Sequence, residues 1–276
     1  MKATNFILLA SQRTGTDMLK RVLETDPRVF AYPEVFHNGS AGASRFPEGI
    51  SYYFDYKQAA VSKHPKHSHP DAAQSLVTDY LKLIEENGKK NDQRVLIDIK
   101  YNSLHHANGT WHAPLDTPVI LEIFSSHHYP VLHLQRRNLL RVAISHFRAA
   151  QTNQYALTDE KDVKRIKFSV DPVQILNFVE DLHNTREIIT RHLQLVGNPC
   201  LNLYYEDLFV GGPGSILNAE QFNRISEFMG IEVPQFDLNP RTVKFAPKDI
   251  ADEIENFHDL KKAIRRTRFK KQLYMP

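Results

Sequence analysis

The chain has 276 residues, of which 41% are hydrophobic and 24% are charged, so its composition is that of a globular protein. Its 35 basic and 32 acidic side chains give a formal net charge of +3, too small to predict nucleic acid as a partner. No window holds the roughly 18 apolar residues that a membrane span needs. The single cysteine, Cys200, excludes an internal disulfide framework and favours a reducing compartment. We therefore expect one domain over residues 1–276, without a membrane span, in the cytoplasm.

Short apolar runs alternate with helix-like segments along the chain. The runs predict four buried strands, at Asn5–Ala10, Arg94–Ile99, Val131–Gln135 and Cys200–Tyr204. The segments between them predict helices at Thr16–Thr25, Asp71–Glu86, Pro118–His127, Leu139–Gln151, Pro172–Leu195 and Ile216–Met229. Thr117 and Asp171 each stand before a proline and are predicted N-caps. This alternation is typical of an α/β fold in which helices flank both faces of a parallel sheet.

The most informative stretch is FILLASQRTGTDML, where an apolar strand ends in a small polar loop before a helix begins. The backbone N–H groups of such a loop point beyond the strand and suit an anion at a helix N-terminus. Gly15 permits close approach of the backbone, and Arg13 adds a forked cation. Thr14 and Thr16 add two hydroxyl groups. A plain strand-to-helix turn with an exposed arginine is the alternative interpretation.

The same loop differs from a Walker A motif at two places. Ala10 stands where that motif has its first glycine, and Thr16 stands where it has its lysine. A P-loop nucleotide kinase is therefore disfavoured by the residues themselves.

Two later strand ends carry related signals. In VLHLQRRNLLRVAISHF, a strand ends at Arg137 and Ser145 lies two helical turns further on, so the pair can hold a second phosphate. A solvated basic helix start is the alternative there. In CLNLYYEDLF, Tyr205 follows a strand, where it can contact an adenine or pack in the core. Because the carboxyl ends of parallel strands share one sheet edge, the three segments are expected to converge.

Together the three segments resemble the sulfotransferases that use 3′-phosphoadenosine 5′-phosphosulfate (PAPS). That family reads roughly [KR]-[ST]-G-T-[TS] in the first loop, R-[DN] with a serine eight residues after the arginine in the second, and Y-E-D-L in the third. Residues 13–16, 137–145 and 205–208 match these patterns. The resemblance implies a P-loop-like sulfotransferase fold with PAPS as co-substrate. It implies that the nucleotide is bound by Arg13, Thr14, Gly15, Thr16, Arg137, Ser145 and Tyr205.

Two positions depart from the family pattern. Asp17 stands where the family usually has a threonine or serine for the 5′-phosphate, so it either faces away or weakens nucleotide binding. The basic C-terminal run at Phe269-Lys270-Lys271 matches the family's R-K-G segment only loosely and can equally be a solvated charge run.

Glu34 is the predicted catalytic base. It follows a short apolar run, Val29–Ala31, that can add a strand, and related bacterial carbohydrate and protein-tyrosine sulfotransferases keep a glutamate at about this place. The phenol and steroid enzymes of the family carry K-x-H instead. Here Lys100 is present but Asn102 replaces the histidine, which leaves the neighbouring loop histidines, His105 and His106, as the alternative base. Lys100 is still predicted to contact the sulfuryl group, and Arg13 the leaving phosphate.

No metal ion is expected, because a sulfuryl group carries less charge than a phosphoryl group. Fourteen histidines, notably His64, His67 and His69, invite a metal interpretation, but no cysteine or carboxylate stands at ligand spacing beside them.

The expected acceptor is a carbohydrate or another small molecule with a hydroxyl group. Residues 37–70 and 152–169 lack a clear period and are predicted acceptor-binding loops. A non-catalytic nucleotide-binding or scaffold protein is the alternative from another class. The acceptor's identity and the oligomeric state are not encoded in any recognisable pattern.

Overall fold

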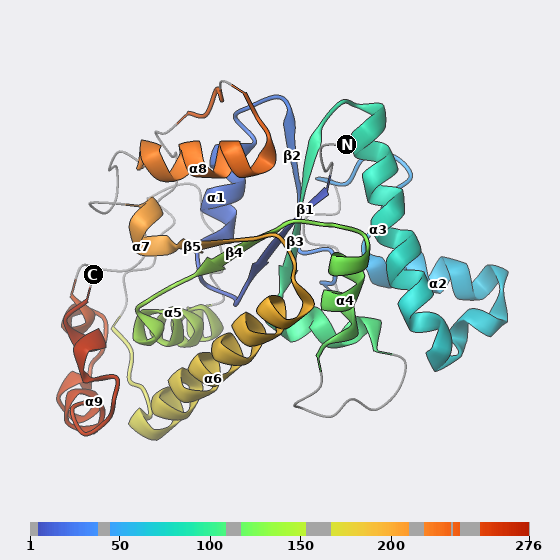
Figure 1. Cartoon of the computed structure of the whole chain (residues 1–276). Coiled ribbons are helices and arrows are strands. Elements are labelled where there is room, and N and C mark those ends of the chain that lie inside the picture. Colours follow the sequence, from blue (N-terminus) through green and yellow to red (C-terminus); the bar gives the residue numbers. More distant parts are fainter. Residues whose placement is uncertain are drawn as a thin grey trace.

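The computed structural model describes residues 5–37, 45–108, 117–152, 167–209, 218–232, 234–237 and 249–275. Within them, one sheet has the strand order β2-β3-β1-β4-β5, and neighbouring strands all run parallel (Figure 1). The strands are β1 (Asn5–Ala10), β2 (Val29–Tyr32), β3 (Arg94–Lys100), β4 (Val131–Gln135) and β5 (Cys200–Tyr204). The α/β fold and all four predicted strands are confirmed, and the short run at 29–31 forms β2.

Helices surround this sheet. They are α1 (Thr16–Leu23), α2 (Tyr53–Lys63), α3 (Ala73–Lys90), α4 (Val119–Ser126), α5 (Leu139–Thr152), α6 (Pro172–Val196), α7 (Tyr205–Leu208), α8 (Ala219–Met229) and α9 (Phe257–Ile264). None of the helices in the described ranges is long and apolar enough to cross a membrane.

One of the two predicted N-caps is confirmed and the other is wrong. Asp171 accepts a hydrogen bond from the Val173 N–H at 2.8 Å and caps α6. Thr117 does not cap α4, whose N-cap residue is Pro118 and has no side-chain cap. The Thr117 hydroxyl instead contacts Nδ1 of His192 on α6 at 2.9 Å, because α4 and α6 pack on the same face of the sheet.

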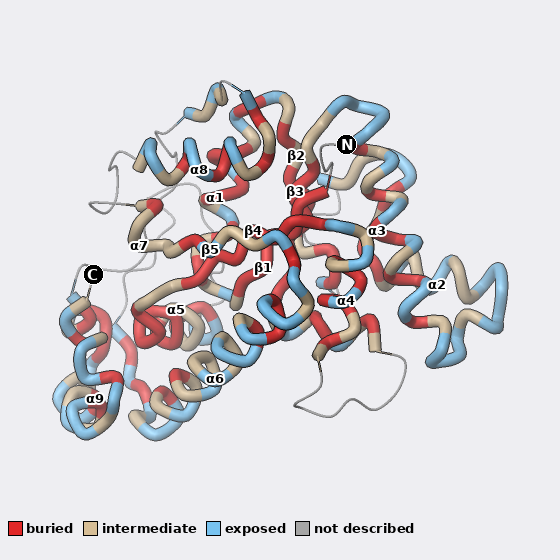
Figure 2. The backbone as a smooth tube through the Cα atoms, in the orientation of Figure 1, coloured by how far each residue is buried: buried red, intermediate tan, exposed pale blue. Residues whose placement is uncertain are grey.

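Alternate residues of each strand face opposite sides of the sheet. On β1, Phe6, Leu8 and Ala10 pack with α1 and α8, whereas Ile7 and Leu9 pack with α3, α4 and α6. Strands β1, β3 and β4 accordingly form the buried centre of the molecule, whereas β5 at the edge of the sheet is only partly buried (Figure 2). Burial on both faces explains why β1 reads as an almost continuous apolar run in the sequence.

A third apolar cluster joins α5 to the first half of α6 and to C-terminal residues 250–273. The C-terminal segment also caps α5: the Asn138 amide donates to the carbonyls of Gln272 and Met275, each at 3.0 Å, and Gln272 Oε1 accepts from the Leu140 N–H at 2.8 Å. Since α5 follows β4 directly, these contacts hold the start of α5 at the carboxyl end of the sheet.

His133 on β4 lies in a buried polar network between strands. Its Nε2 lies 2.6 Å from the Tyr101 hydroxyl, and its Nδ1 lies 3.0 Å from Oδ1 of Asn202 on β5. Burial lowers the pKa of His133 to about 4, with a smaller effect in the same direction from Arg186, against the raising effect of Asn202. The ring is therefore neutral in the folded protein near pH 7.

We expect the free energy of unfolding to fall as the pH is lowered from 6.5 to about 4. Over this range the unfolded chain binds a proton at His133 that the native protein does not, so acid favours unfolding. The contribution of His133 is on the order of 3 kcal/mol. Urea denaturation at several pH values should show a shallower pH dependence in His133→Gln than in the wild type, and equal slopes would contradict a neutral buried ring.

Candidate active site

The loop after β1, which is the predicted anion cradle, is a tight turn. Arg13 has φ 64° and Gly15 has φ 92°, so both lie in the left-handed region that non-glycine residues rarely adopt. Gly15 is the N-cap residue of α1 and supplies no side-chain cap for its N–H groups. The Thr14 hydroxyl donates to the Ser11 carbonyl at 2.8 Å and closes the turn. The predicted cradle is thus a tight left-handed turn at the start of a helix.

Tyr205, the third predicted segment's tyrosine, packs directly on this turn. A Cβ added to Gly15 would lie 2.6 Å from Cδ2 of the Tyr205 ring. The Arg136 guanidinium lies over the same ring, 4.7 Å from its centroid, and Phe209 contacts it at a centroid distance of 4.7 Å. Arg136 and Phe209 thereby hold the Tyr205 ring against the first loop.

Gly15→Ala is expected to destabilise the protein more than Gly197→Ala. Both glycines have positive φ, but an added Cβ at Gly197 meets nothing within 4 Å. We expect a loss of about 1 kcal/mol for Gly197→Ala from the backbone alone. For Gly15→Ala, we expect a further loss of about 1–3 kcal/mol from the clash with Tyr205. Urea denaturation measures both; equal losses would show that Tyr205 does not pack on Gly15.

The structure brings the first and second predicted segments together. Nε of Arg13 donates to Oγ of Ser145 at 3.1 Å, although 132 residues separate them in the sequence. Arg13 follows β1 and Ser145 lies on α5, which follows β4. Because β1 and β4 pair side by side, the loops at their carboxyl ends meet.

The Arg137 side chain contacts residues 204 and 207, at the third predicted segment. Its guanidinium forms two hydrogen bonds with the Asp207 carboxylate, at 2.5 and 2.7 Å, and lies over the Tyr204 ring at 4.1 Å from the centroid. The pKa of Arg137 is raised by the hydrogen bond with Asp207. Its backbone N–H donates to both oxygens of Glu206, at 3.1 and 3.0 Å. In this structure the Y-E-D-L segment therefore holds the Arg137 side chain.

A cluster of buried guanidinium groups stands beside Ser145. Arg141 and Arg148 lie on the same face of α5 as Ser145, one turn on either side of it, and are 7% and 8% exposed. Arg148 donates to Oε1 of Glu253 at 2.7 Å. Burial lowers the pKa of Arg136 and of Arg141. Burial also raises the pKa of Glu253, against the opposing effect of Arg148 and, to a smaller extent, of Arg141 and Arg136.

Sequence reasoning placed an anion at Ser145 but did not include this cluster. Arg136, Arg141 and Arg148 interact with the Glu253 carboxylate, and two further carboxylates lie near them, Glu206 beside Arg136 and Asp249 beside Arg141. The signal available in the sequence was the i, i+4, i+7 spacing of Arg141, Ser145 and Arg148. Glu253 had no such signal, because it comes from a C-terminal segment more than 100 residues away.

Lys100 lies on the other side of the first loop. Its Nζ donates to Oγ1 of Thr16 at 2.6 Å and to Oδ1 of Asp98 at 2.7 Å. The carboxylate of Glu34, the residue after Pro33 at the end of β2, lies with Oε1 3.6 Å from Lys100 Nζ. Lys100 is buried, whereas the Glu34 side chain is 35% exposed. A carboxylate open to solvent thus stands next to a buried ammonium at the carboxyl edge of the sheet.

Asp17, the departure from the family pattern, turns toward Lys20. Its Oδ1 lies 3.0 Å from Nζ of Lys20, and its side chain is 63% exposed. Partial desolvation opposes ionisation, but Lys20 outweighs it and lowers the pKa of Asp17. Asp17 is therefore an ionised carboxylate whose charge is offset by Lys20 on the same helix.

The alternative base residues occupy separate surroundings. His105 is exposed, and His106 packs against Phe36 and Phe54 at centroid distances of 5.7 and 4.8 Å. Burial lowers the pKa of His106 to about 4, aided by His105. The described residues contain no group of three or more histidine, cysteine or carboxylate side chains that could hold a metal ion.

The predicted acceptor loops are only partly described. Residues 38–44 of the first and 153–166 of the second lie outside the described residues. The first loop was predicted to be irregular throughout, but it contains α2. Only Tyr53 of this helix is buried, so its sequence shows no apolar stripe with a helical period.

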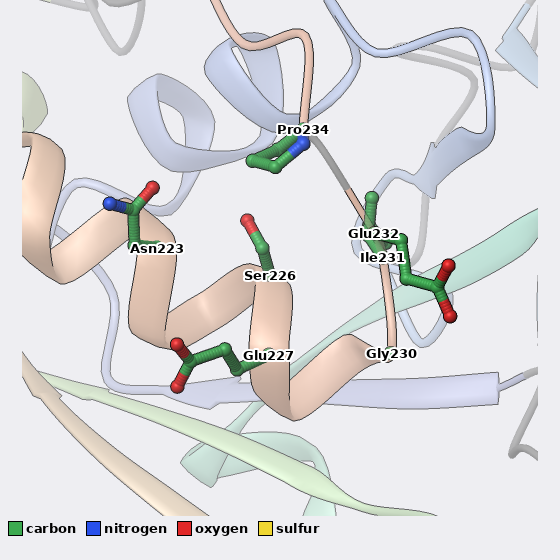
Figure 3. A pocket seen from close by; sticks show the side chains of 7 residues that line it. All are labelled: Asn223, Ser226, Glu227, Gly230, Ile231, Glu232 and Pro234. Atoms are coloured by element: carbon green, nitrogen blue, oxygen red, sulfur yellow. The ribbon is translucent and has the colours of Figure 1, made fainter.

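A cleft of about 500 Å³ lies elsewhere, along the C-terminal half of α8 (Figure 3). Its lining is Asn223, Ser226, Glu227, Gly230, Ile231, Glu232 and Pro234. Arg94, the first residue of β3, donates to the Met229 carbonyl at 3.2 Å, which places this end of α8 at the amino end of the strands. The cleft contains none of the predicted site residues.

The geometry defines an α/β protein whose sheet brings Arg13, Ser145, Lys100 and Glu34 to the carboxyl ends of its strands. No known family model matches the sequence, and no curated protein is significantly similar to it. The crystal structure of a sulfotransferase from Alicyclobacillus acidocaldarius is similar in fold, with 12% sequence identity and a TM-score of 0.47. The similarity covers 96% of this chain and 90% of that one. At this identity the activity has to be inferred from the site itself.

Proposed function

We propose that the chain is a PAPS-dependent sulfotransferase, built as one domain over residues 1–276. It transfers a sulfuryl group from PAPS to a hydroxyl group of a carbohydrate or another small acceptor. The observation that carries the proposal is the position of the first loop. On one side Arg13 contacts Ser145, and on the other Thr16 contacts Lys100, which stands beside Glu34.

Each site residue has its own role in the proposed transfer. Arg13 and the loop N–H groups stabilise the negative charge that develops on the leaving 5′-phosphate. The hydroxyl oxygen of the acceptor forms a bond to sulfur while the bond from sulfur to the phosphate oxygen breaks. Glu34 accepts the proton that this hydroxyl group loses. Lys100 contacts the transferred group, whose charge it offsets. Thr14, Gly15, Thr16 and Tyr205 shape the loop that holds the nucleotide.

The 3′-phosphate is assigned to Ser145 and Arg137, as the sequence motif implies. The proposal requires Arg137 to exchange Asp207 for the phosphate when the nucleotide binds. Arg136 and Arg141 join the assignment because both are positively charged and lie next to Tyr205 and Ser145 respectively.

Arg137→Ala is expected to weaken binding of 3′-phosphoadenosine 5′-phosphate by roughly 10- to 100-fold, the value of a hydrogen bond to a charged group. The affinity for adenosine 5′-phosphate, which lacks the 3′-phosphate, should remain unchanged. Calorimetric titration of both nucleotides measures this difference. An unchanged affinity for the bisphosphate would remove Arg137 from the site and leave Arg136 and Arg141 as the residues to replace next.

Transfer of radiolabelled sulfate from PAPS to a panel of sugars, polyols and phenols tests the activity itself. Transfer by the wild type supports the proposal, whereas tight nucleotide binding without transfer to any acceptor supports the non-catalytic alternative. The proposed reaction needs no metal ion and no nucleic acid. The single cysteine favours the cytoplasm as its location.

A further inference from the structure

Lys100, Asp98 and Lys20 form a row of buried ion pairs. The proposed reaction assigns no role to Asp98 or Lys20. The two oxygens of Asp98 accept from different lysines: Oδ1 from Lys100 and Oδ2 from Lys20, each at 2.7 Å. Asp98 is fully buried and each lysine is 2% exposed. Charges this deeply buried destabilise a protein unless they are paired. The fold therefore has to hold these three side chains in one defined arrangement.

Two periodicities create this arrangement. Asp98 and Lys100 are two residues apart on β3 and therefore face the same side of the sheet. Thr16 and Lys20 are four residues apart on α1 and lie on one face of that helix. The two pairs meet because α1 packs on this side of the sheet, where Thr16 contacts Lys100 and Lys20 contacts Asp98.

The row of ion pairs restricts how Lys100 can move. Since each oxygen of Asp98 holds one ammonium, the carboxylate cannot rotate without breaking an ion pair. Two of the three N–H groups of Lys100 are fixed, by Asp98 and by Thr16, and this fixes the direction of the third. Oε1 of Glu34 lies 3.6 Å from this ammonium, and the more distant Asp17 carboxylate also interacts with it.

We propose that Asp98 and Lys20 are positioning residues that hold the Lys100 ammonium at the point where the transferred group meets the acceptor beside Glu34. The inference rests on the proposed function, because Lys100 acts there on the sulfuryl group. Asp98 and Lys20 contact no reacting atom and act through Lys100 alone.

Steady-state kinetics of Asp98→Asn, Lys100→Met and the double variant test this dependence. Asp98→Asn is expected to lower kcat on the order of 100-fold, the effect of a misplaced catalytic group, with the affinity for 3′-phosphoadenosine 5′-phosphate unchanged. In the Lys100→Met background the same change should lower kcat by less than about threefold, because residues that act as a unit are not additive. Losses that multiply in the double variant, or a parallel loss of nucleotide affinity, would overturn the proposal.

A charge-balanced variant and a matched control separate positioning from stability. Asp98→Asn leaves two ammonium groups without their shared carboxylate, so Lys20→Met/Asp98→Asn, which removes one charge of each sign, is the second variant. It should also lower kcat on the order of 100-fold. Asp26→Asn is the control: Asp26 is equally buried and pairs with Arg28 at 2.7 Å, next to the amino end of β2, and it should leave kcat within about twofold.

A crystal structure of the charge-balanced variant keeps this proposal separate from the proposed function. Lys100 Nζ is expected to leave Thr16 Oγ1. If Nζ stays within about 3 Å of that oxygen, the positioning role is overturned whatever the activity of the wild type. If Nζ moves away but the wild type transfers no sulfate, the positioning role stands and the proposed function fails.

Discussion

Glu34→Gln is expected to lower kcat for sulfate transfer by roughly 100- to 10,000-fold, the usual contribution of a general base. Glutamine keeps the shape of the side chain but cannot accept the proton of the acceptor hydroxyl. The affinity for 3′-phosphoadenosine 5′-phosphate should change little, because Glu34 lies by Lys100 rather than by Arg13 and Ser145. Steady-state kinetics and calorimetric titration measure the two quantities separately.

Glu85→Gln is the matched control for this variant. Glu85 is also a partly exposed glutamate, 23% against 35%, and its Oε1 lies 2.6 Å from Nζ of Lys89. It lies on α3, away from the first loop, so its replacement should leave kcat unchanged. If Glu34→Gln kept wild-type activity, Glu34 would not be the base, and the partly buried His106 would become the residue to replace.

Arg13→Gly is expected to abolish most activity while leaving the protein folded. The variant loses the guanidinium that is proposed to offset the charge of the leaving phosphate, which should lower kcat by roughly 100- to 1,000-fold and weaken nucleotide binding. Arg13 has φ 64°, a conformation that glycine adopts without strain. Relief of that strain, about 1 kcal/mol, should offset the lost hydrogen bond to Ser145, which is of similar size. The free energy of unfolding, from urea denaturation, should therefore stay close to that of the wild type.

Asp92→Gly provides the control for the backbone effect. Asp92 has φ 51° in the turn between α3 and β3, outside the candidate site. This variant should be as stable as the wild type or slightly more stable, with full activity. Full activity in Arg13→Gly as well would exclude a role for the guanidinium in the reaction.

The sheet was predictable because both of its faces are covered. Residues such as Leu8 and Ile7 on β1 face opposite sides yet are both fully buried, so this strand is a continuous apolar run with clear ends. The meeting of Arg13 with Ser145 was predictable for a related reason: parallel strands bring the loops at their carboxyl ends together wherever the strands pair.

What the sequence did not predict depends on partners from distant segments. The pairing of Arg137 with Asp207 and of Arg148 with Glu253 joins residues 70 and 105 positions apart, and no local pattern specifies either. Lys20 and Asp98 each look like an ordinary charge in the sequence, and only the packing of α1 on β3 buries them together. Helix α9 was missed because it covers α5 and α6 with a single short apolar stripe, Leu260 and Ile264.

Calorimetric titration of the wild-type protein with 3′-phosphoadenosine 5′-phosphate, compared with ATP, tests the central claim most directly. A site that joins Arg13, Ser145 and the guanidinium cluster of α5 should bind the bisphosphate at one site per chain, and more tightly than ATP. Absence of binding, or a preference for ATP, would show that these strand ends do not form a site for an adenosine that carries both a 3′- and a 5′-phosphate.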